Sequence, residues 1–243
     1  MSFDIIDAST AVAAALFALT FLFGYRVHPL QGVIKDRRSI VSFGAGVSTA
    51  YLFVRMMPEL SDAQHALNEN RLSIYMIALI GFVIVYGMNH FSRAGSAILA
   101  AGRTEARELA SAEPGAMVLG MTFYVFLLTF VLVREPAGSP GAVLQFAIAI
   151  SFHFLAVDHS LEDELGDAYH ARTRFRLAGA CLVGWVLGQF APVSDFTVAI
   201  LFALVSGGVI VNSAVMELPT EKDGRFLPFA AGCLLFGLVL MTL

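Results

Sequence analysis

The segment 151–170, SFHFLAVDHSLEDELGDAYH, concentrates the side chains of this chain that suit a metal ion. It begins in an apolar run and contains three histidines and five carboxylates. Imidazole and carboxylate groups are ligands that zinc and iron accept in proteins. The segment is therefore either a metal site or the hydrated end of a helix.

His153 and Asp158 are the candidate metal ligands within the apolar part of this segment. A polar group inside a membrane is costly, so it tends to be functional or paired. Asp158 follows five residues after His153, and a local π-bulge would be needed to point both side chains at one ion. The alternative is a structural histidine that bonds to a neighbouring helix.

The residues that follow have two interpretations as well. Asp158 with Glu162, and His159 with Asp163, are spaced i,i+4 and would share a face on a continued helix. His159, Glu162 and Asp163 would then form a weak cytoplasmic exit site for a cation. The alternative is a solvated segment whose acids are balanced by the basic residues after it, Arg172, Arg174 and Arg176.

Apolar segments must position these groups. The chain has 243 residues, of which 58% are hydrophobic and 14% charged, whereas soluble domains have roughly 25% charged residues. The loops leave no room for a soluble domain, so residues 1–243 are predicted to form a single all-α transmembrane domain. A span needs about 20 apolar residues, and eight stretches approach this length: 5–25, 39–58, 72–92, 116–134, 142–158, 175–191, 195–217 and 226–243.

Charge placement predicts the orientation of this eight-helix bundle. Most lysines and arginines follow odd-numbered spans, and basic loops stay in the cytoplasm. Both termini are therefore expected to be extracytoplasmic, and the lipid bilayer, of the bacterial inner membrane type, is the expected environment. The formal net charge of −4 argues against a nucleic-acid partner.

Three further features of the sequence concern helix packing, one surface segment and one charged residue. Small residues are concentrated in 42–50, 177–184, 205–209 and 229–237, which predicts close helix packing in lipid. Residues 94–113 form either an amphipathic surface helix or an extension of the third span. Arg55 either extends to the membrane interface or pairs with Glu59 one turn later. If it stood in a vestibule instead, it would repel cations.

Two stretches resemble the ZIP family of divalent metal transporters. SFGAGVSTAYLFVRMMPEL, 42–60, is similar to the family's second helix, with Pro58 and Glu59 matching its ending and Arg55 replacing a histidine. SGGVIVNSAVMELP, 206–219, resembles the seventh helix, in which Glu217 matches an acidic residue. The resemblance implies a ZIP-like bundle that carries zinc, iron or another divalent cation as its substrate.

The resemblance also implies metal ligands on the fourth and fifth spans. His153 matches a family ligand, although a second alignment that begins at His159 is open. The predicted transport path is formed by His153, Asp158, Thr122, Asn212 and Glu217, with His153 and Asp158 as metal ligands. Other ligand positions are apolar here, namely Met121, Val125, Phe154 and Val157.

Two functions follow from this pattern. The first is a ZIP-like transporter of divalent metal with a degraded intramembrane site, and the second is a non-transporting subunit or regulator on the same scaffold. An intramembrane metallohydrolase is disfavoured, because it needs three converging zinc ligands and the six histidines are scattered without an HExxH motif. We expect no enzyme activity and no resident cofactor, and a homodimer is compatible with the sequence.

Overall fold

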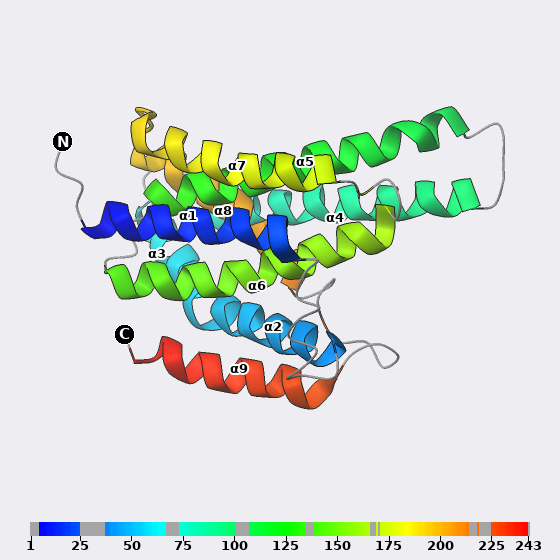
Figure 1. The fold of residues 1–243 in the computed structure, drawn as a ribbon. Helices are drawn as coiled ribbons and strands as arrows, with labels where there is room; N and C mark the ends of the chain where they lie inside the picture. The colour runs from blue at the N-terminus through cyan, green and yellow to red at the C-terminus, as the bar shows by residue number, and fades with distance from the viewer. Residues whose placement is uncertain are drawn as a thin grey trace.

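The computed structural model describes residues 5–24, 37–66, 73–100, 107–134, 139–165, 169, 171–213, 218 and 225–242. These residues contain helices and no strand. The helices pack side by side in one bundle (Figure 1). They are α1 (Ile5–Phe23), α2 (Arg37–Tyr51), the π-helix η2 (Leu52–Met56), α3 (Met57–Ala66), α4 (Ile74–Ala100), α5 (Arg107–Arg134), α6 (Pro140–Leu165), α7 (Ala171–Phe190), α8 (Asp195–Val211) and α9 (Phe226–Leu240).

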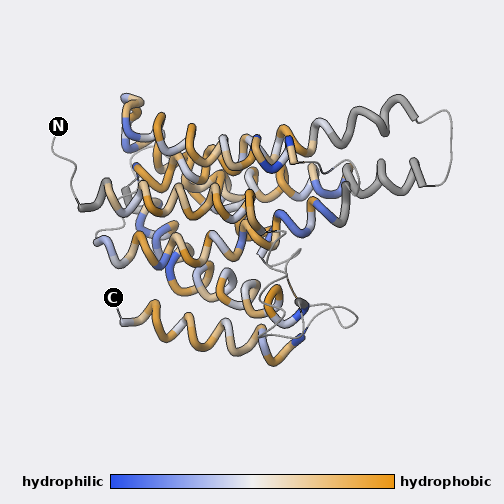
Figure 2. The backbone as a smooth tube through the Cα atoms, viewed as in Figure 1, coloured by the Kyte–Doolittle hydropathy of each residue, from blue (hydrophilic) through white to orange (hydrophobic). Residues whose placement is uncertain are grey.

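Helices lie at each of the apolar stretches predicted from the sequence. Among the described residues, four helical segments are long and apolar enough to cross a membrane: Arg38–Gln64, Ile74–Phe91, Met117–Arg134 and Pro140–Glu162. Large apolar side chains such as Leu119, Phe175 and Leu227 are exposed on the outside of the bundle. Apolar residues dominate the middle of the helices (Figure 2). These features indicate an integral membrane protein in contact with lipid.

The helices pack in pairs that are distant in sequence. α2 lies against α9, α4 against α8, and α5 against α7, while α1 contacts both α6 and α7. At the α4–α8 seam, a Cβ atom on Gly207 would overlap the carbonyl oxygen of Ala78, and one on Gly81 would overlap that of Leu204. The backbones of α2 and α9 approach each other as closely, again at glycines. The prediction of close packing at the small-residue segments is therefore confirmed for the seams that contain Gly46, Gly232 and Gly207.

Gly207→Ala should test this packing. The added methyl group meets backbone rather than a movable side chain, so we expect the free energy of unfolding in detergent to fall by about 1–3 kcal/mol. Gly179→Ala is the matched control, because a Cβ atom there meets nothing within 4 Å. Alanine is the better helix former, and the control should be neutral or stabilising. Equal effects of the two substitutions on the unfolding transition would contradict the close seam.

The segment around residues 94–113 belongs to two long helices. α4 continues to Ala100 and α5 begins at Arg107, and both extend beyond the rest of the bundle (Figure 1). Residues 94–100 therefore extend the helix of the third predicted span, as one of the two interpretations has it, whereas residues 107–113 belong to the next helix. Residues 101–106 lie outside the described part of the chain.

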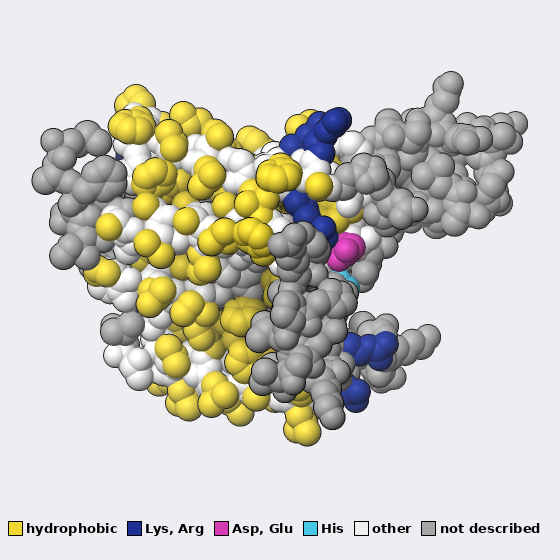
Figure 3. All heavy atoms as spheres, viewed as in Figure 1, with side chains coloured by type: hydrophobic (Ala, Val, Ile, Leu, Met, Phe, Trp, Pro, Cys, Tyr) yellow, Lys and Arg dark blue, Asp and Glu magenta, His cyan; other side chains and the backbone are white. Residues whose placement is uncertain are grey.

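Exposed arginines define one end of the bundle, called here the basic end. They are Arg38, Arg172, Arg176 and Arg225, near the starts of α2, α7 and α9. Figure 3 shows apolar side chains along the flank and Lys or Arg side chains gathered beside it at this end. α1 begins and α9 finishes at the opposite end (Figure 1).

Candidate functional site

His153 is held by a hydrogen bond between two helices. Its side chain on α6 is fully buried, and its Nε2 atom lies 3.0 Å from the hydroxyl oxygen of Tyr124 on α5. The two rings meet edge to face, with centroids 6.0 Å apart. Tyr124 therefore supplies the partner that a buried imidazole requires. This geometry agrees with a structural histidine.

Asp158 belongs to a separate polar cluster, called here the α6–α7 clamp, which consists of Asp158, Glu162, Tyr169 and Arg174. The Tyr169 hydroxyl donates to Asp158 Oδ1. Arg174 Nε lies 3.5 Å from the same oxygen, and Arg174 Nη2 lies 3.3 Å from Glu162 Oε1. The Arg174 guanidinium also lies over the Tyr169 ring, 4.8 Å from its centroid. The clamp ties the last turns of α6 to the start of α7.

Tyr169 stays protonated in this arrangement. It lies between α6 and α7 and is buried. Burial, followed by the neighbouring Asp158 carboxylate, raises the pKa of the Tyr169 phenol well above its ordinary value of 10.0. The hydroxyl is therefore a lasting donor to Asp158, and the carboxylate is satisfied by a phenol and a guanidinium.

The other predicted site residues have different surroundings. The Thr122 hydroxyl donates to the carbonyl of Val118 in its own helix, at 2.6 Å. Asn212 accepts a hydrogen bond from the Asn89 amide, at 3.2 Å. His159 is half-buried on α6. Glu217 and the side chain of Asp163 lie outside what the structure describes.

The structure thus gives His153 and Asp158 different partners. α6 is α-helical through both residues, without the π-bulge that would turn them toward each other. Within the described residues no three His, Cys, Asp or Glu side chains form a group that could hold a metal ion. The apolar residues at the ligand positions, Met121, Val125, Phe154 and Val157, are all core residues.

A band of buried polar groups crosses the bundle near α8. Ser48 on α2 shares a hydrogen bond of 2.7 Å with Ser213, while Asn89 on α4 bonds to Asn212. The Nδ2 atom of Asn212 is buried and has no hydrogen-bond partner among the described residues. Buried amide donors in proteins usually have an acceptor, and residues 214–217, which follow directly, lie outside the described part of the chain. Asn212 was identified from the sequence, whereas the pairing of Ser48 with Ser213 was not.

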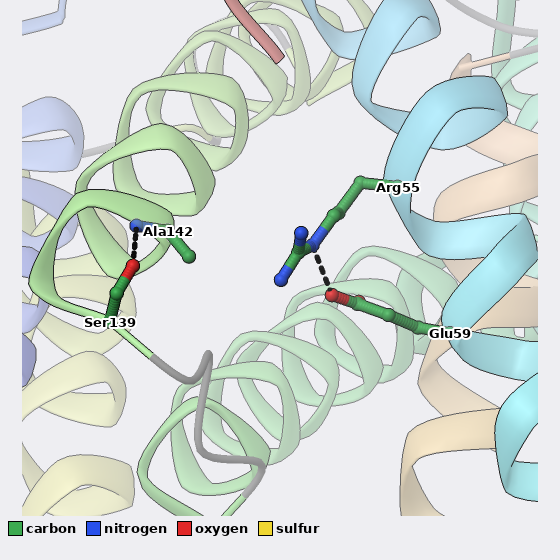
Figure 4. Close-up of polar contacts among 4 residues, drawn as sticks. All are labelled: Arg55, Glu59, Ser139 and Ala142. Atoms are coloured by element: carbon green, nitrogen blue, oxygen red, sulfur yellow. Dashed lines mark hydrogen bonds and ion pairs between the residues drawn. The ribbon is translucent and has the colours of Figure 1, made fainter. Parts of the chain in front are cut away.

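A cavity of about 470 Å³ opens between α2, η2, α3, α5, α6 and α8 at the end opposite the basic end. Its walls are largely apolar and aromatic, and its charged residues come from η2, α3 and α8. Arg55 Nε lies 2.6 Å from Glu59 Oε1, which confirms the predicted pairing of these two residues (Figure 4). Both side chains line the cavity, so Arg55 is paired and also stands in a vestibule.

The local sequence explains why the helix that carries Arg55 and Glu59 widens beside the cavity. Pro58 has no N–H to donate to the carbonyl four residues earlier, so a regular α-helical turn cannot close there. The helix widens into η2, which carries Arg55, and π-turns of this kind occur often at functional sites. Across the cavity, the Ala142 N–H donates to Ser139 Oγ at 3.2 Å and caps the start of α6 (Figure 4). From the sequence, a vestibule at Arg55 was one alternative, but the residues that line this cavity were not predicted.

Glu162 should contribute little to stability despite its place in the clamp. Its side chain is 41% exposed, and exposed ion pairs contribute about 0–1 kcal/mol. We therefore expect Glu162→Gln to change the free energy of unfolding by about 1 kcal/mol or less, with unchanged expression. Denaturant titration in detergent measures this. A larger loss would show that Glu162, rather than Asp158, is the principal partner of Arg174.

Compared with known proteins, the chain matches no family model, no curated protein and no solved structure at a significant level. The function is therefore argued from the geometry of the chain.

Proposed function

We propose that this chain is an eight-span membrane carrier for a small solute, with both termini on the extracytoplasmic side and a ZIP-like arrangement of helices. The cavity carries this proposal, because it admits solvent-sized molecules into the bundle from one end. The clamp of Asp158, Tyr169 and Arg174 joins α6 to α7 near the basic end. A carrier must be open at one end and closed at the other in any one state. In the proposal, the cavity and the clamp supply this difference.

Buried polar groups support a route beyond the cavity. Leu128 on the cavity wall is one helical turn from Tyr124, and Phe146 is about two turns from His153. On α8, Ser206 lines the cavity and Asn212 follows six residues later. The same helices thus carry both the cavity and the buried polar groups. In the proposal, a solute would pass from the cavity toward Asn212 and then to the basic end.

A divalent metal ion is the cargo that the ZIP resemblance suggests. His153, Asp158, Thr122, Asn212 and Glu217 remain the proposed path, with His159, Glu162 and Asp163 at the exit. The proposal includes weak metal binding, because structural zinc sites use four ligands and His153 is already bonded to Tyr124.

A second candidate is a non-transporting subunit or regulator on the same scaffold. It is favoured by the apolar side chains at ligand positions, since Phe154 and Val125 are fully buried in the core. Such a protein would need a packed bundle but no route through it.

Flux measurements separate the two candidates. The full chain would be reconstituted in liposomes, and zinc uptake and solute-induced current would be compared with protein-free liposomes. A carrier gives flux that saturates with concentration, and Asp158→Asn, which removes a charge from the clamp, should alter its rate. Absence of flux for zinc and for organic ions alike would leave the non-transporting scaffold as the function.

The orientation has its own test. We expect cysteines at Ser194 and Arg172, both exposed, to react with a membrane-impermeant maleimide from opposite sides of the membrane. Ser194 should label in intact cells, and Arg172 only after permeabilisation. Replacing Cys181 and Cys233 by alanine removes the native thiols. Labelling of both positions from one side would contradict the predicted topology.

A further inference from the structure

We propose that the cavity binds an amphipathic organic cation, an ammonium compound with an apolar or aromatic body. The inference rests on the proposed function, because it assigns a ligand class to the cavity that serves there as the entrance. It is carried by the size of the cavity, the charge of its lining and one buried polar side chain.

The walls favour an organic ligand over a bare inorganic ion. Small-molecule pockets commonly have volumes of about 300–1,000 Å³ and mostly apolar walls, and the cavity, of about 470 Å³, falls within this range. Leu128, Phe146 and Phe202 form part of its wall. A hydrocarbon body gains by leaving water for such walls, whereas a bare metal ion gains nothing from these apolar side chains.

The charge of the lining favours a cation. The cavity is lined by one basic residue, Arg55, and three acidic residues, Glu59, Asp62 and Asp195, so its formal charge is +1 − 3 = −2. Glu59 already engages Arg55 at 2.6 Å. Asp62 and Asp195 are exposed and form no ion pair within the described part of the chain. These two carboxylates remain for an ammonium group.

Tyr51 supplies an independent indication of a ligand. Its side chain lines the cavity and is only 4% exposed, and no hydrogen bond to its hydroxyl is present in the part of the chain that the structure describes. Its ring packs edge to face on Phe146, with centroids 5.5 Å apart. Aromatic rings attract ammonium groups through their faces, and a hydroxyl oxygen offers a further acceptor dipole.

An anionic ligand fits less well. Arg55 is the basic side chain of the lining, and its guanidinium is shared with Glu59. The start of α8 would favour an anion through its helix dipole, but Asp195 occupies that first turn. An anion would therefore meet the repulsion of Asp62 and Asp195 without an open basic group in the described lining.

Calorimetry on the purified full chain in detergent tests the proposal. Benzyltrimethylammonium is the cationic probe, and benzenesulfonate is an aromatic anion of similar size. We expect the cation to bind at least tenfold more tightly than the anion. The double substitution Asp62→Asn with Asp195→Asn should weaken cation binding at least tenfold. Arg176→Gln, at an exposed position of the basic end outside the cavity lining, should leave it unchanged.

A blocking variant gives a second measurement. Ala63 lies half-buried in the lining, so Ala63→Trp should abolish binding while the protein keeps its elution volume in size-exclusion chromatography. Equal binding of cation and anion, or undiminished binding by the double Asn variant, would overturn the inference. Cation binding without flux in liposomes would overturn only the carrier function. Zinc flux without binding of the cationic probe would overturn the inference about the ligand and leave the carrier function standing.

Discussion

Arg174→Ala should lower the free energy of unfolding by about 3–5 kcal/mol, the typical cost of breaking a buried ion pair from one side. The Asp158 and Arg174 side chains are only 3% and 13% exposed. Without the guanidinium, Asp158 would keep only the Tyr169 hydroxyl as a partner in the clamp. The carboxylate would then either stay charged in an apolar setting or take up a proton, and both are unfavourable. Thermal and denaturant unfolding in detergent measure the loss.

Two comparisons make this result specific to the clamp. Arg172→Ala removes an exposed arginine two residues away and should change stability by about 1 kcal/mol or less. The pair Asp158→Asn with Arg174→Met removes both charges, and it should recover much of the stability lost in Arg174→Ala. If Arg172→Ala proved as damaging as Arg174→Ala, the clamp would not be the reason.

The helices were predictable because hydropathy along the chain decides them. The predicted span 142–158 lies within α6 (Pro140–Leu165), and 175–191 nearly coincides with α7 (Ala171–Phe190). The pairing of the helices could not be predicted in this way. A glycine in a helix indicates that another backbone approaches closely, but it does not identify that backbone. Gly207 meets Ala78, more than a hundred residues earlier, and no local pattern encodes that choice.

The polar partners escaped prediction for the same reason. The possibility of a histidine bonded to another helix was open, but Tyr124 lies 29 residues before His153 and belongs to no motif. For Asp158, balance by a following arginine was one of the interpretations, and Arg174 supplies it. The chain just after α1 also lies close to this carboxylate, since a Cβ atom on Gly24 would come within 3.1 Å of Asp158 Oδ2.

The cavity was the least accessible feature from sequence. It is assembled from α2, η2, α3, α5, α6 and α8, and each contributes only a few side chains. The pairing of Arg55 with Glu59 was predicted from the i,i+4 spacing. That the same pair lines a cavity with Asp195, some 140 residues later, follows only from the packing of α8.

His153→Ala should be the second strongly destabilising substitution, by about 3 kcal/mol or more. The imidazole is fully buried, so its removal leaves a void comparable with other large-to-small core changes. It also leaves the Tyr124 hydroxyl without its partner across the helices, at a further cost of about 1–3 kcal/mol. Unfolding in detergent should therefore occur at lower temperature than in the wild type.

Tyr124→Phe separates the hydrogen bond from the packing. It removes only the hydroxyl, and its cost should be about 1–3 kcal/mol. Once Tyr124→Phe is present, His153→Ala should cost less than it does alone, because the partner it would orphan is gone. Fully additive losses would show that the contact of 3.0 Å contributes no coupling energy.

Zinc calorimetry on the same variants distinguishes a structural histidine from a metal ligand. If His153 serves Tyr124, zinc should bind weakly to the wild type, because no group of three ligands is present among the described residues. His153→Gln, which keeps a polar side chain of similar reach, should then preserve much of the stability. Tight zinc binding that is lost in His153→Gln would make His153 a ligand after all. Tight binding that survives would place the metal elsewhere, with the acids and histidines of segment 158–170 as the first positions to substitute.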